Sequence, residues 1–439
     1  MDIIEPRILK GTRDFLPEEM LQREGIVAVI KGAFKRYGFL PIETPAMEYL
    51  DVLLGKYGEE SDKLIYRLAY KDGRTLGLRY DLTVPLSRLI ATYRGGIQMP
   101  FKRYQIQPVW RADRPQIRQG RFREFYQCDA DVVGSDAMLA DAEIVALTAE
   151  ILSALGFERF LVRINHRKIL GAVARHAGLG PESEAAVCGC IDKLDKIGPD
   201  GVRKEMHDCG FGDEAITHIF EVLELEGDEE ELLGLLSGLL GDVEPAREGI
   251  KETRELLGAV RELGVPPDRF RLDLNLARGL DYYTGPIYES ILPDHPHIGS
   301  LAGGGRYDEL IGMYCGVDTP ATGTTIGLDR IFAAMGQLGM LSEARTTTKV
   351  LVVNFGGGAT AQALRTAGRF REAGVPTEVY YEPAKLKKQF SYADRKGIPF
   401  VAVVGEAEAA SGEVGLKNMS TGEQERLPLD EALERLSGG

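Results

Sequence analysis

The sequence predicts an α+β protein with antiparallel strands in its first part, a helical insertion, and a C-terminal α/β domain. Two alternating runs at 101–111 and 123–134 flank an arginine-rich loop, which indicates an antiparallel hairpin. Residues 169–264 have helical periodicity, many Glu and Leu, and no strand run. From residue 348 onward strands and helices alternate, which is typical of a parallel sheet covered by helices.

Length and composition limit the class of protein. A chain of 439 residues is long enough for two to four domains. Its 44% hydrophobic and 27% charged residues are typical of a globular protein, and no apolar run approaches the roughly 20 residues that cross a membrane. The N-terminal MDIIEPRILK lacks the charged-then-apolar pattern of a signal peptide. We therefore expect a cytoplasmic protein with no membrane partner.

Charge and cysteine content exclude two further classes. A net charge of −14 argues against a protein that coats nucleic acid without specificity, but it leaves open an RNA partner of defined shape. The five cysteines form no C-x-x-C pair, and the C-x-C at Cys188 and Cys190 lacks the second pair that zinc needs. We expect reduced thiols and no metal site built from protein ligands alone.

The first 80 residues predict a helix, a proline-limited segment and a hairpin. The helix covers 19–37 and ends at a glycine. Pro41 and Pro45 confine the next segment to a sheet edge or to a contact between subunits, and the sequence leaves both open. Asp72 and the glycine after it lie between two alternating runs at 64–80, a strong β-hairpin pattern.

Asp81, Leu82 and Thr83 follow the second strand of this hairpin. They precede a helix that the sequence predicts through Ile90. Asp81 is compatible with a purely structural N-cap and also with a ligand-binding carboxylate.

The hairpin at 101–134 carries the strongest indication of a site. Along its second strand Phe125, Gln127, Asp129 and Asp131 share one face. Two carboxylates and an amide on one face are unusual in a core. Guanidinium groups pair with phosphate or carboxylate, and carboxylates hold ammonium or N–H groups. The hairpin therefore predicts a site for a polyphosphate beside a small zwitterion.

Later segments add candidate residues. A helix over 137–155 and a strand lead into the insertion, whose three histidines lack the spacing of metal ligands. The glycines 303–305 allow close approach of a ligand, although most glycine triplets are turns. At 323–335 a glycine-rich strand runs into a helix with Arg330 in its first turns. Because a helix start favours anions, this arginine is better placed if a phosphate meets it.

The C-terminal region holds no evident cofactor motif. Its glycines 356–358 lack the spacing of a dinucleotide fingerprint. Four basic residues form either a solvated helix face or a contact with a phosphate backbone: Lys385, Lys387, Lys388 and Arg395.

Five motifs, in the same order, resemble those of the histidyl-tRNA synthetases, a family of class II aminoacyl-tRNA synthetases. They are RYDLTVP at 79–85, VWRADRPQIRQGRFREFYQCDADVVG at 109–134, RGLDYYTG at 278–285, AGGGRYDEL at 302–310 and GTTIGLDR at 323–330. The resemblance extends over nearly the whole chain, including KLKKQFSYADRKGIPFVAVVGE near the C-terminus. RGLDYYTG is highly specific to histidyl enzymes.

The resemblance implies an architecture. A class II core, a mostly antiparallel sheet flanked by helices, would comprise residues 1–168 and 265–341. The helical insertion would be 169–264, and an α/β anticodon-binding domain would be 348–439. The family is dimeric through the first motif, here around Pro45.

The resemblance also implies the reaction. L-Histidine and ATP would give histidyl-adenylate and pyrophosphate, and histidine would then pass to the 3′-terminal ribose of tRNA(His). The partners would be ATP with Mg²⁺, L-histidine, tRNA(His) and a second copy of the chain. A pocket that hydrogen-bonds both imidazole nitrogens rejects apolar competitors by roughly 10⁴-fold, so no editing domain is required.

Phosphate and adenine roles follow from the matching motif positions. Arg111 would bind the α-phosphate and the histidine carboxylate, with Arg278 as a second positive charge there. Arg330 would clamp the γ-phosphate. Phe125 would stack on adenine, and Glu124 would lie on the adenine or metal side.

The histidine-binding set implied by the resemblance is Asp81, Leu82, Thr83, Arg111, Gln127, Asp131, Arg278, Tyr282 and Tyr283. Asp81, Thr83 and Gln127 would hold the ammonium group, while Asp131 and Tyr283 would read the imidazole nitrogens. Tyr282 would line the pocket.

Four further residues complete the expected set. Arg306 and Tyr307 belong to the second histidine motif, and Arg114 and Gln116 would face the tRNA acceptor end. Two alternatives stay open. A regulatory paralogue that senses histidine would generally lack the anticodon domain, and another class II synthetase would differ in its amino-acid pocket.

Overall fold

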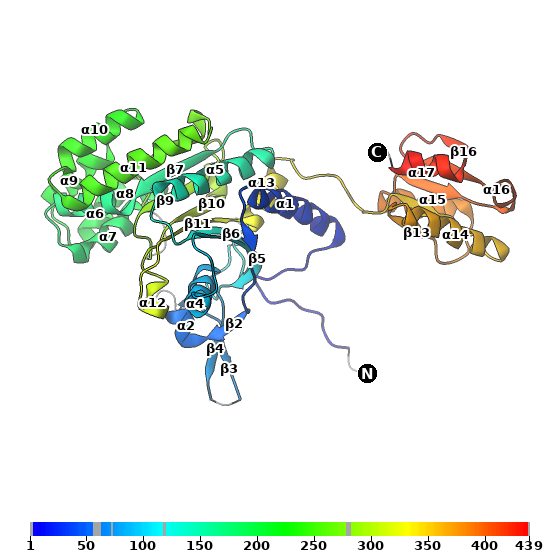
Figure 1. Ribbon diagram of the computed structural model, residues 1–439, viewed down its shortest axis with the longest axis horizontal. Coiled ribbons are helices and arrows are strands. Elements are labelled where there is room, and N and C mark those ends of the chain that lie inside the picture. Colours follow the sequence, from blue (N-terminus) through cyan, green and yellow to red (C-terminus); the bar gives the residue numbers. More distant parts are fainter. Residues whose placement is uncertain (1–2, 56–62, 72, 117–119, 278–281, 438–439) are drawn as a thin grey trace. The chain divides into compact units, whose positions relative to one another are not determined.

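The computed structural model describes residues 3–55, 63–71, 73–116, 120–277 and 282–437 (Figure 1). Arg278 and the Asp72 of the expected hairpin turn lie outside these ranges. The chain divides into two compact units. The first comprises Met1–Arg13 and Ile26–Met340, and the second comprises Asp14–Gly25 and Leu341–Gly439.

An eight-stranded sheet organises the described part of the first unit. Its order is β1 (Leu40–Pro41), β5 (Phe101–Trp110), β6 (Glu124–Val133), β11 (Ala321–Ile326), β10 (Ala302–Arg306), β9 (Pro286–Ile291), β7 (Leu161–His166) and β8 (Phe270–Leu272). The outermost pairs, β1 with β5 and β7 with β8, are parallel, and all pairs between them are antiparallel. The expectation of a mostly antiparallel core sheet is confirmed.

The predicted hairpin lies within this sheet. Strands β5 and β6 pair along ten residues, from Phe101 opposite Val133 to Trp110 opposite Glu124. On its other side β6 pairs with β11, a strand almost 200 residues later in the chain. The polar face of β6 is therefore bordered by a strand from each half of the core.

A smaller antiparallel sheet combines β2 (Met47–Tyr49), β4 (Thr75–Leu78) and β3 (Arg67–Ala69). The pairing of β3 with β4 confirms the hairpin expected at 64–80. Helix α4 (Thr83–Tyr93) begins soon after β4, so the chain delivers Asp81 to the start of a helix. Helices α2 (Leu50–Leu54) and α12 (Gly312–Cys315) lie at this end, whereas α1 (Pro17–Arg36) does not (Figure 1).

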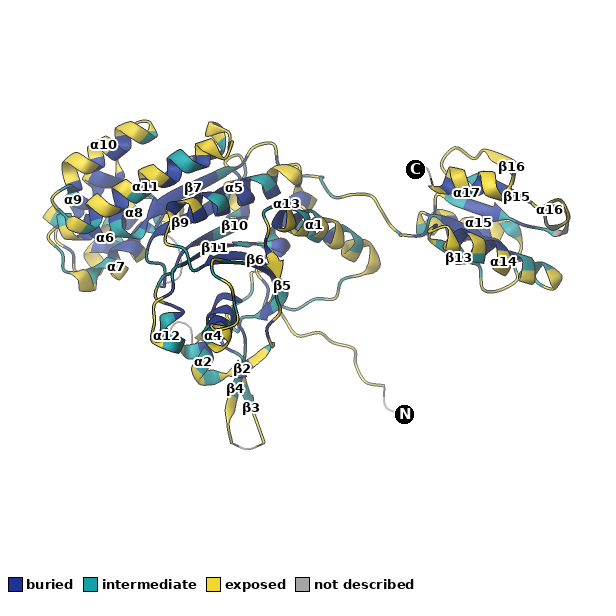
Figure 2. Ribbon diagram, viewed as in Figure 1, coloured by how far each residue is buried: buried dark blue, intermediate teal, exposed yellow. Residues whose placement is uncertain are grey.

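Helices flank the large sheet and fill the insertion. Helix α5 (Met138–Ala154) is buried along most of its length, and α13 (Leu328–Gln337) follows β11 (Figure 2). The insertion consists of α6 (Arg167–His176), α7 (Glu184–Ile191), α8 (Leu194–Asp208), α9 (Asp213–Leu223), α10 (Glu229–Leu240) and α11 (Glu244–Glu262). No strand interrupts these helices, as the sequence predicted for this stretch, which the structure describes throughout.

The second unit contains a five-stranded sheet in the order β13 (Thr377–Val379), β12 (Val350–Val352), β14 (Phe400–Val403), β15 (Glu413–Asn418) and β16 (Gln424–Pro428). Helices α14 (Gly358–Glu372) and α17 (Leu429–Ser437) share one apolar core with the sheet, while α15 (Leu386–Lys396) shares the core on the other face. The short helix α16 (Glu406–Ser411) precedes β15.

The expectation of a wholly parallel sheet was wrong for this unit. Strands β13, β12 and β14 are parallel, whereas β15 and β16 form an antiparallel hairpin that extends the sheet. The signal in the sequence was weak because β16 is mostly polar and exposed. Its pairing depends on a turn at Gly422, whose φ is +79°.

Candidate functional site

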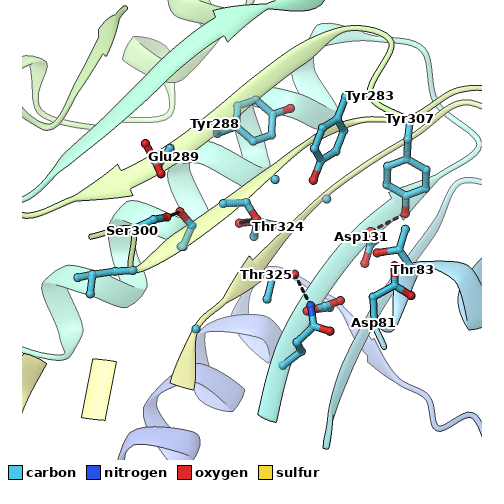
Figure 3. A pocket seen from close by; sticks show the side chains of 18 of the residues that line it. Asp81, Thr83, Asp131, Tyr283, Tyr288, Glu289, Ser300, Tyr307, Thr324 and Thr325 are labelled. Atoms are coloured by element: carbon cyan, nitrogen blue, oxygen red, sulfur yellow. Dashed lines mark hydrogen bonds between the residues drawn. The ribbon is translucent and has the colours of Figure 1, made fainter. Parts of the chain in front are cut away.

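A cavity of about 390 Å³ lies over the centre of the large sheet (Figure 3). It is bordered by β6, β11, β10 and β9, by the chain before α4, and by the first turn of α13. Ten of the expected site residues line it: Asp81, Thr83, Arg111, Phe125, Gln127, Asp131, Tyr282, Tyr283, Tyr307 and Arg330. Residues from both halves of the core sequence thus meet in one place.

Asp131 is held at one end of the cavity by two partners. The hydroxyl of Tyr307 donates a hydrogen bond to Asp131 Oδ1, as Figure 3 shows. Arg103 Nη2, on β5, lies 2.7 Å from Asp131 Oδ2 as a buried ion pair. Burial raises the pKa of Asp131, and the positive charge of Arg103 opposes that rise. This carboxylate is therefore fixed in direction before any ligand arrives.

Gly323 provides the space that Asp131 occupies. It lies opposite Asp131 in the β6–β11 register, and a Cβ there would overlap Asp131 Oδ1. In the same way a Cβ at Gly304 would overlap the backbone of Gly323, and one at Gly305 would lie 2.9 Å from the Tyr283 ring. The triplet 303–305 is thus part of strand β10 and not a turn, and its missing side chains make room for the cavity wall.

Asp81 caps the start of α4 and also lines the cavity. Its Oδ1 accepts a hydrogen bond from the Val84 backbone N–H at 3.1 Å, which stabilises the start of α4. Its Oδ2 is buried without a hydrogen-bond partner among the described residues and belongs to the cavity lining. Burial raises the pKa of Asp81 to about 6.

Gln127 and Asp129 follow Asp131 along the same face of β6. Gln127 Nε2 donates a hydrogen bond to Thr325 Oγ1 at 3.2 Å, so its Oε1 is left as an acceptor. Gln127 Oε1 and Asp129 Oδ1 are buried and have no hydrogen-bond partner within the described chain. Burial raises the pKa of Asp129 to about 7, while Arg103 acts in the opposite direction.

Aromatic rings form the wall beside Asp131. Tyr282 packs edge-on against Tyr283 with ring centroids 5.0 Å apart, and against Tyr307 at 5.8 Å. Burial raises the pKa of all three hydroxyl groups, so they are neutral hydrogen-bonding groups at physiological pH.

Two arginines also line the cavity. Arg111 Nε donates to the Tyr80 carbonyl at 3.0 Å, and its guanidinium lies 5.1 Å from the centre of the Phe125 ring. Arg330 Nη1 donates to the Ser300 carbonyl at 2.8 Å. A second cavity of about 230 Å³ shares Arg111, Phe125 and Arg330 and extends the site toward Arg114.

Five expected residues within the described chain do not line the main cavity, and one of them, Arg114, lines only the second. Leu82 is buried at the start of α4, and Glu124 is exposed at the beginning of β6. Arg306 is buried in an ion pair with Asp141 of α5. Gln116 is exposed and lines neither cavity.

Several lining residues received no individual role from the sequence, although Asp129 was part of the predicted polar face. They are Asp129, Tyr288, Glu289, Ser300, Thr324 and Thr325. Arg103 was missed as the partner of Asp131, although Arg103, Gln105 and Gln107 alternate along β5 and could have indicated a polar strand face. The alternation does not reveal which carboxylate lies opposite, because that depends on strand pairing.

Comparison with known proteins gives two family matches. Residues 11–331 match the family model described as histidyl-tRNA synthetase, and residues 349–438 match the anticodon binding domain. A histidine–tRNA ligase from Gloeobacter violaceus is 45% identical over 98% of this chain and 97% of its own length. A histidine–tRNA ligase from Cytophaga hutchinsonii is 43% identical over 98% and 99%.

Solved structures agree on the architecture. The crystal structure of histidyl-tRNA synthetase from Nostoc sp. PCC 7120 has a TM-score of 0.88 and 35% identity, and the match covers 99% of this chain and 100% of that one. A Bacillus halodurans structure described as an ATP phosphoribosyltransferase regulatory subunit/histidyl-tRNA synthetase has a TM-score of 0.73 at 23% identity, over 88% and 97%. Because the identity is only 23%, this second match shows a similarity of fold alone.

Proposed function

The chain belongs to the histidyl-tRNA synthetase family, and we infer that the cavity over β6 is where it activates histidine. The family reaction is the ATP-dependent ligation of L-histidine to tRNA(His). Histidine and ATP give histidyl-adenylate and pyrophosphate, and the histidyl group then passes to the 3′-terminal ribose of the tRNA.

The combination of buried acceptors and arginines in the cavity carries this assignment. Asp81, Gln127 and Asp131 contribute acceptors to its lining, and Arg111 and Arg330 contribute guanidinium groups. A zwitterionic amino acid beside a polyphosphate has the complementary distribution of charge. The two adjoining cavities, about 390 and 230 Å³, provide room for both.

On the amino-acid side, Asp81, Thr83 and Gln127 bind the α-ammonium group. Asp131 and Tyr283 bind the imidazole nitrogens, and this is supported by the orientation that Tyr307 imposes on Asp131. Because these polar groups would be unpaired with an apolar amino acid, the pocket favours histidine strongly.

At the reacting centre, a carboxylate oxygen of histidine attacks the α-phosphorus in line, and pyrophosphate leaves. Arg111 binds the α-phosphate and the substrate carboxylate, and the motif match assigns Arg278 a second positive charge there. Arg330 binds the γ-phosphate, and Phe125 stacks on adenine. The chemistry needs no covalent bond to the protein, so catalysis consists of positioning and charge stabilisation.

We assign Mg²⁺ to the nucleotide. The described residues contain no group of three or more His, Cys, Asp or Glu side chains arranged to hold a metal. A magnesium ion that is bound mainly by the phosphate oxygens of ATP needs only one or two protein carboxylates. In the motif match Glu124 would lie on the adenine or metal side, and the ion would supply neutralisation of phosphate charge.

The tRNA contacts and the domain division extend this proposal. Arg114 and Gln116 face the acceptor end, and the anticodon-binding domain at 348–439 binds the anticodon region. The core comprises 1–168 and 265–341, with the insertion at 169–264 clasping the acceptor stem. Helices α6–α11 and the separate sheet of the second unit support this division.

The active form is a homodimer that works in the cytoplasm. Leu40, Met47 and Tyr49 are 60%, 56% and 47% exposed on the segment of the first motif, and this apolar surface supports a subunit contact there. All five cysteines are free, which is usual for a reducing compartment. Among the described residues no helix combines the length and apolar character of a membrane span.

Pyrophosphate exchange into ATP, measured with each of the standard amino acids, tests the function. Exchange with histidine alone is the expected result. Exchange with a different amino acid would identify another class II specificity, and absence of exchange with all of them would favour a regulatory paralogue. Light scattering in solution tests the dimer.

A further inference from the structure

We propose that Asp129 is an additional acceptor for the α-ammonium group of histidine, acting together with Asp81 and Gln127. The proposal rests on the proposed function, because it takes histidine as the ligand of the cavity. The sequence placed Asp129 on the polar face of the hairpin, but the motif match assigned it no individual role.

Position is the first argument. Asp129 lies on β6 between Gln127 and Asp131, on the face that lines the cavity. Its side chain is only 2% exposed, yet its Oδ1 has no hydrogen-bond partner within the described chain. A buried acceptor without a partner destabilises the free protein, so a ligand that donates to it recovers that loss.

The number of acceptors is the second argument. An α-ammonium group carries three N–H donors. Four buried acceptors of the cavity lack a hydrogen-bond partner among the described residues: Asp81 Oδ2, Gln127 Oε1, Asp129 Oδ1 and Asp131 Oδ2. Asp131 Oδ2 is engaged in the ion pair with Arg103 Nη2, which leaves the other three for an ammonium group. Thr325 lies opposite Asp129 in the β6–β11 register and accepts from Gln127, so Gln127 and Asp129 are bordered by the same threonine.

Charge is the third argument. The groups that act on Asp129 are Arg103 from β5, Asp131 from β6, the Thr325 hydroxyl from β11, and Asp81 before α4. Asp129 in turn acts on the nearby Tyr283. Asp81 and Asp131 both disfavour ionisation of Asp129, and Arg103 is already paired with Asp131. A cation between Asp81 and Asp129 relieves this repulsion.

The imidazole ring is a poorer candidate for this position. Asp131 already provides a directed carboxylate beside Tyr282 and Tyr307, so the aromatic end of the cavity has its acceptor. Along β6, Asp129 is nearer than Asp131 to Gln127, which is assigned to the ammonium group. Asp129 is therefore better placed for the ammonium group than for the imidazole ring.

The decisive comparison uses Asp129→Asn and two histidine analogues as inhibitors of exchange. Histidinol keeps the ammonium group, whereas imidazole-4-propionate lacks it. We expect Asp129→Asn to raise the KM for histidine and the inhibition constant of histidinol by roughly 10- to 100-fold. The KM for ATP and inhibition by imidazole-4-propionate should change less than about twofold. Asp136→Asn makes the same charge change at an exposed position and serves as the control.

A measurement on the unmodified enzyme keeps the test independent of folding. Burial raises the pKa of Asp129 to about 7, so binding of an ammonium group should displace its proton. Calorimetry in buffers of different ionisation enthalpy should show release of roughly half a proton per histidine near pH 7, and less at pH 8.5.

Unchanged histidinol inhibition in Asp129→Asn, equal weakening of both analogues, or no proton release would overturn the proposal. Absence of histidine-dependent exchange by the unmodified enzyme would instead overturn the proposed function.

Discussion

Asp131 lies directly over Gly323, in a space that any side chain at position 323 would fill. A Cβ there would also lie 2.8 Å from the Ala130 carbonyl oxygen. Neither neighbour can move easily, since Ala130 is backbone in the middle of the sheet and Asp131 is held by Tyr307 and Arg103. The direction of the Asp131 carboxylate therefore depends on the absence of a side chain at Gly323, a residue almost 200 positions later in the chain.

The first prediction concerns this contact. Gly323→Ala should raise the KM for histidine at least tenfold and lower the free energy of unfolding by about 1–3 kcal/mol, because it overpacks the sheet. Exchange kinetics and urea denaturation measure the two effects. Gly234→Ala is the matched control, since a Cβ at that exposed site in α10 meets nothing within 4 Å. It should stabilise by about 0.5–1 kcal/mol, and a similar loss of histidine affinity in both variants would contradict the proposed contact.

The second prediction concerns the partner of Asp131. Tyr307→Phe removes the hydrogen bond to Oδ1 but keeps the ring that packs on Tyr282. Loss of a hydrogen bond to a charged group costs about 1.5–3 kcal/mol, so kcat/KM for histidine should fall roughly 10- to 100-fold. The KM for ATP should be unchanged in the same exchange assay. An equal effect on both substrates would mean that Tyr307 has only a general structural role.

The third prediction is a change of stability with pH. Asp129 has a pKa raised to about 7 from an ordinary value near 3.8, so the folded protein keeps a proton that the unfolded chain has lost. The stability that this group contributes is complete below pH 3.8 and decreases as pH rises through 7. Asp129→Asn should therefore increase the stability of the unliganded enzyme at pH 8 by about 1–4 kcal/mol, with roughly half that gain at pH 5.5. Thermal unfolding at both pH values checks this, and a variant that is less stable at pH 8 would contradict it.

The fourth prediction concerns the phosphate end. Arg111→Lys keeps the charge but loses the planar fork that binds a phosphate and a carboxylate together. We expect kcat of exchange to fall about 10²- to 10³-fold, with a smaller change in the KM for histidine. Arg365→Lys, at an exposed position on α14, is the control because exchange requires no tRNA. If KM rises and kcat stays unchanged, Arg111 contributes to substrate binding but does not stabilise the transition state further.

The fifth prediction concerns the second unit. Lys385, Lys387 and Lys388 are exposed where α15 begins. Replacing all three by Ala should raise the KM for tRNA in aminoacylation and make it less sensitive to salt, because fewer counterions are released on binding. Pyrophosphate exchange, which needs no tRNA, should be unaffected. An unchanged salt dependence would assign these lysines to a solvated helix face.

Much of the site was predictable because strand periodicity is a local property. The alternation of Phe125, Gln127, Asp129 and Asp131 along one strand indicated a polar face, and the structure has these side chains lining one cavity. The Asp81 cap was also predictable, since capping involves residues close together in the sequence. The glycines 303–305 could not be predicted as part of strand β10, because glycines have no side chains and so show no alternation of polar and apolar residues.

The sequence by itself determined the order of elements, the helical insertion, the family motifs and the polar face of β6. Only the tertiary structure decided which groups meet: Arg103 with Asp131 across the β5–β6 pair, Tyr307 with Asp131 over 176 residues, and Gly323 beneath them. It also decided that Asp81 and Asp129 are buried without partners for one oxygen each, and hence that their pKa values rise. The physical reason is that pairing register, burial and electrostatic environment are set by contacts between distant segments, which no local pattern encodes.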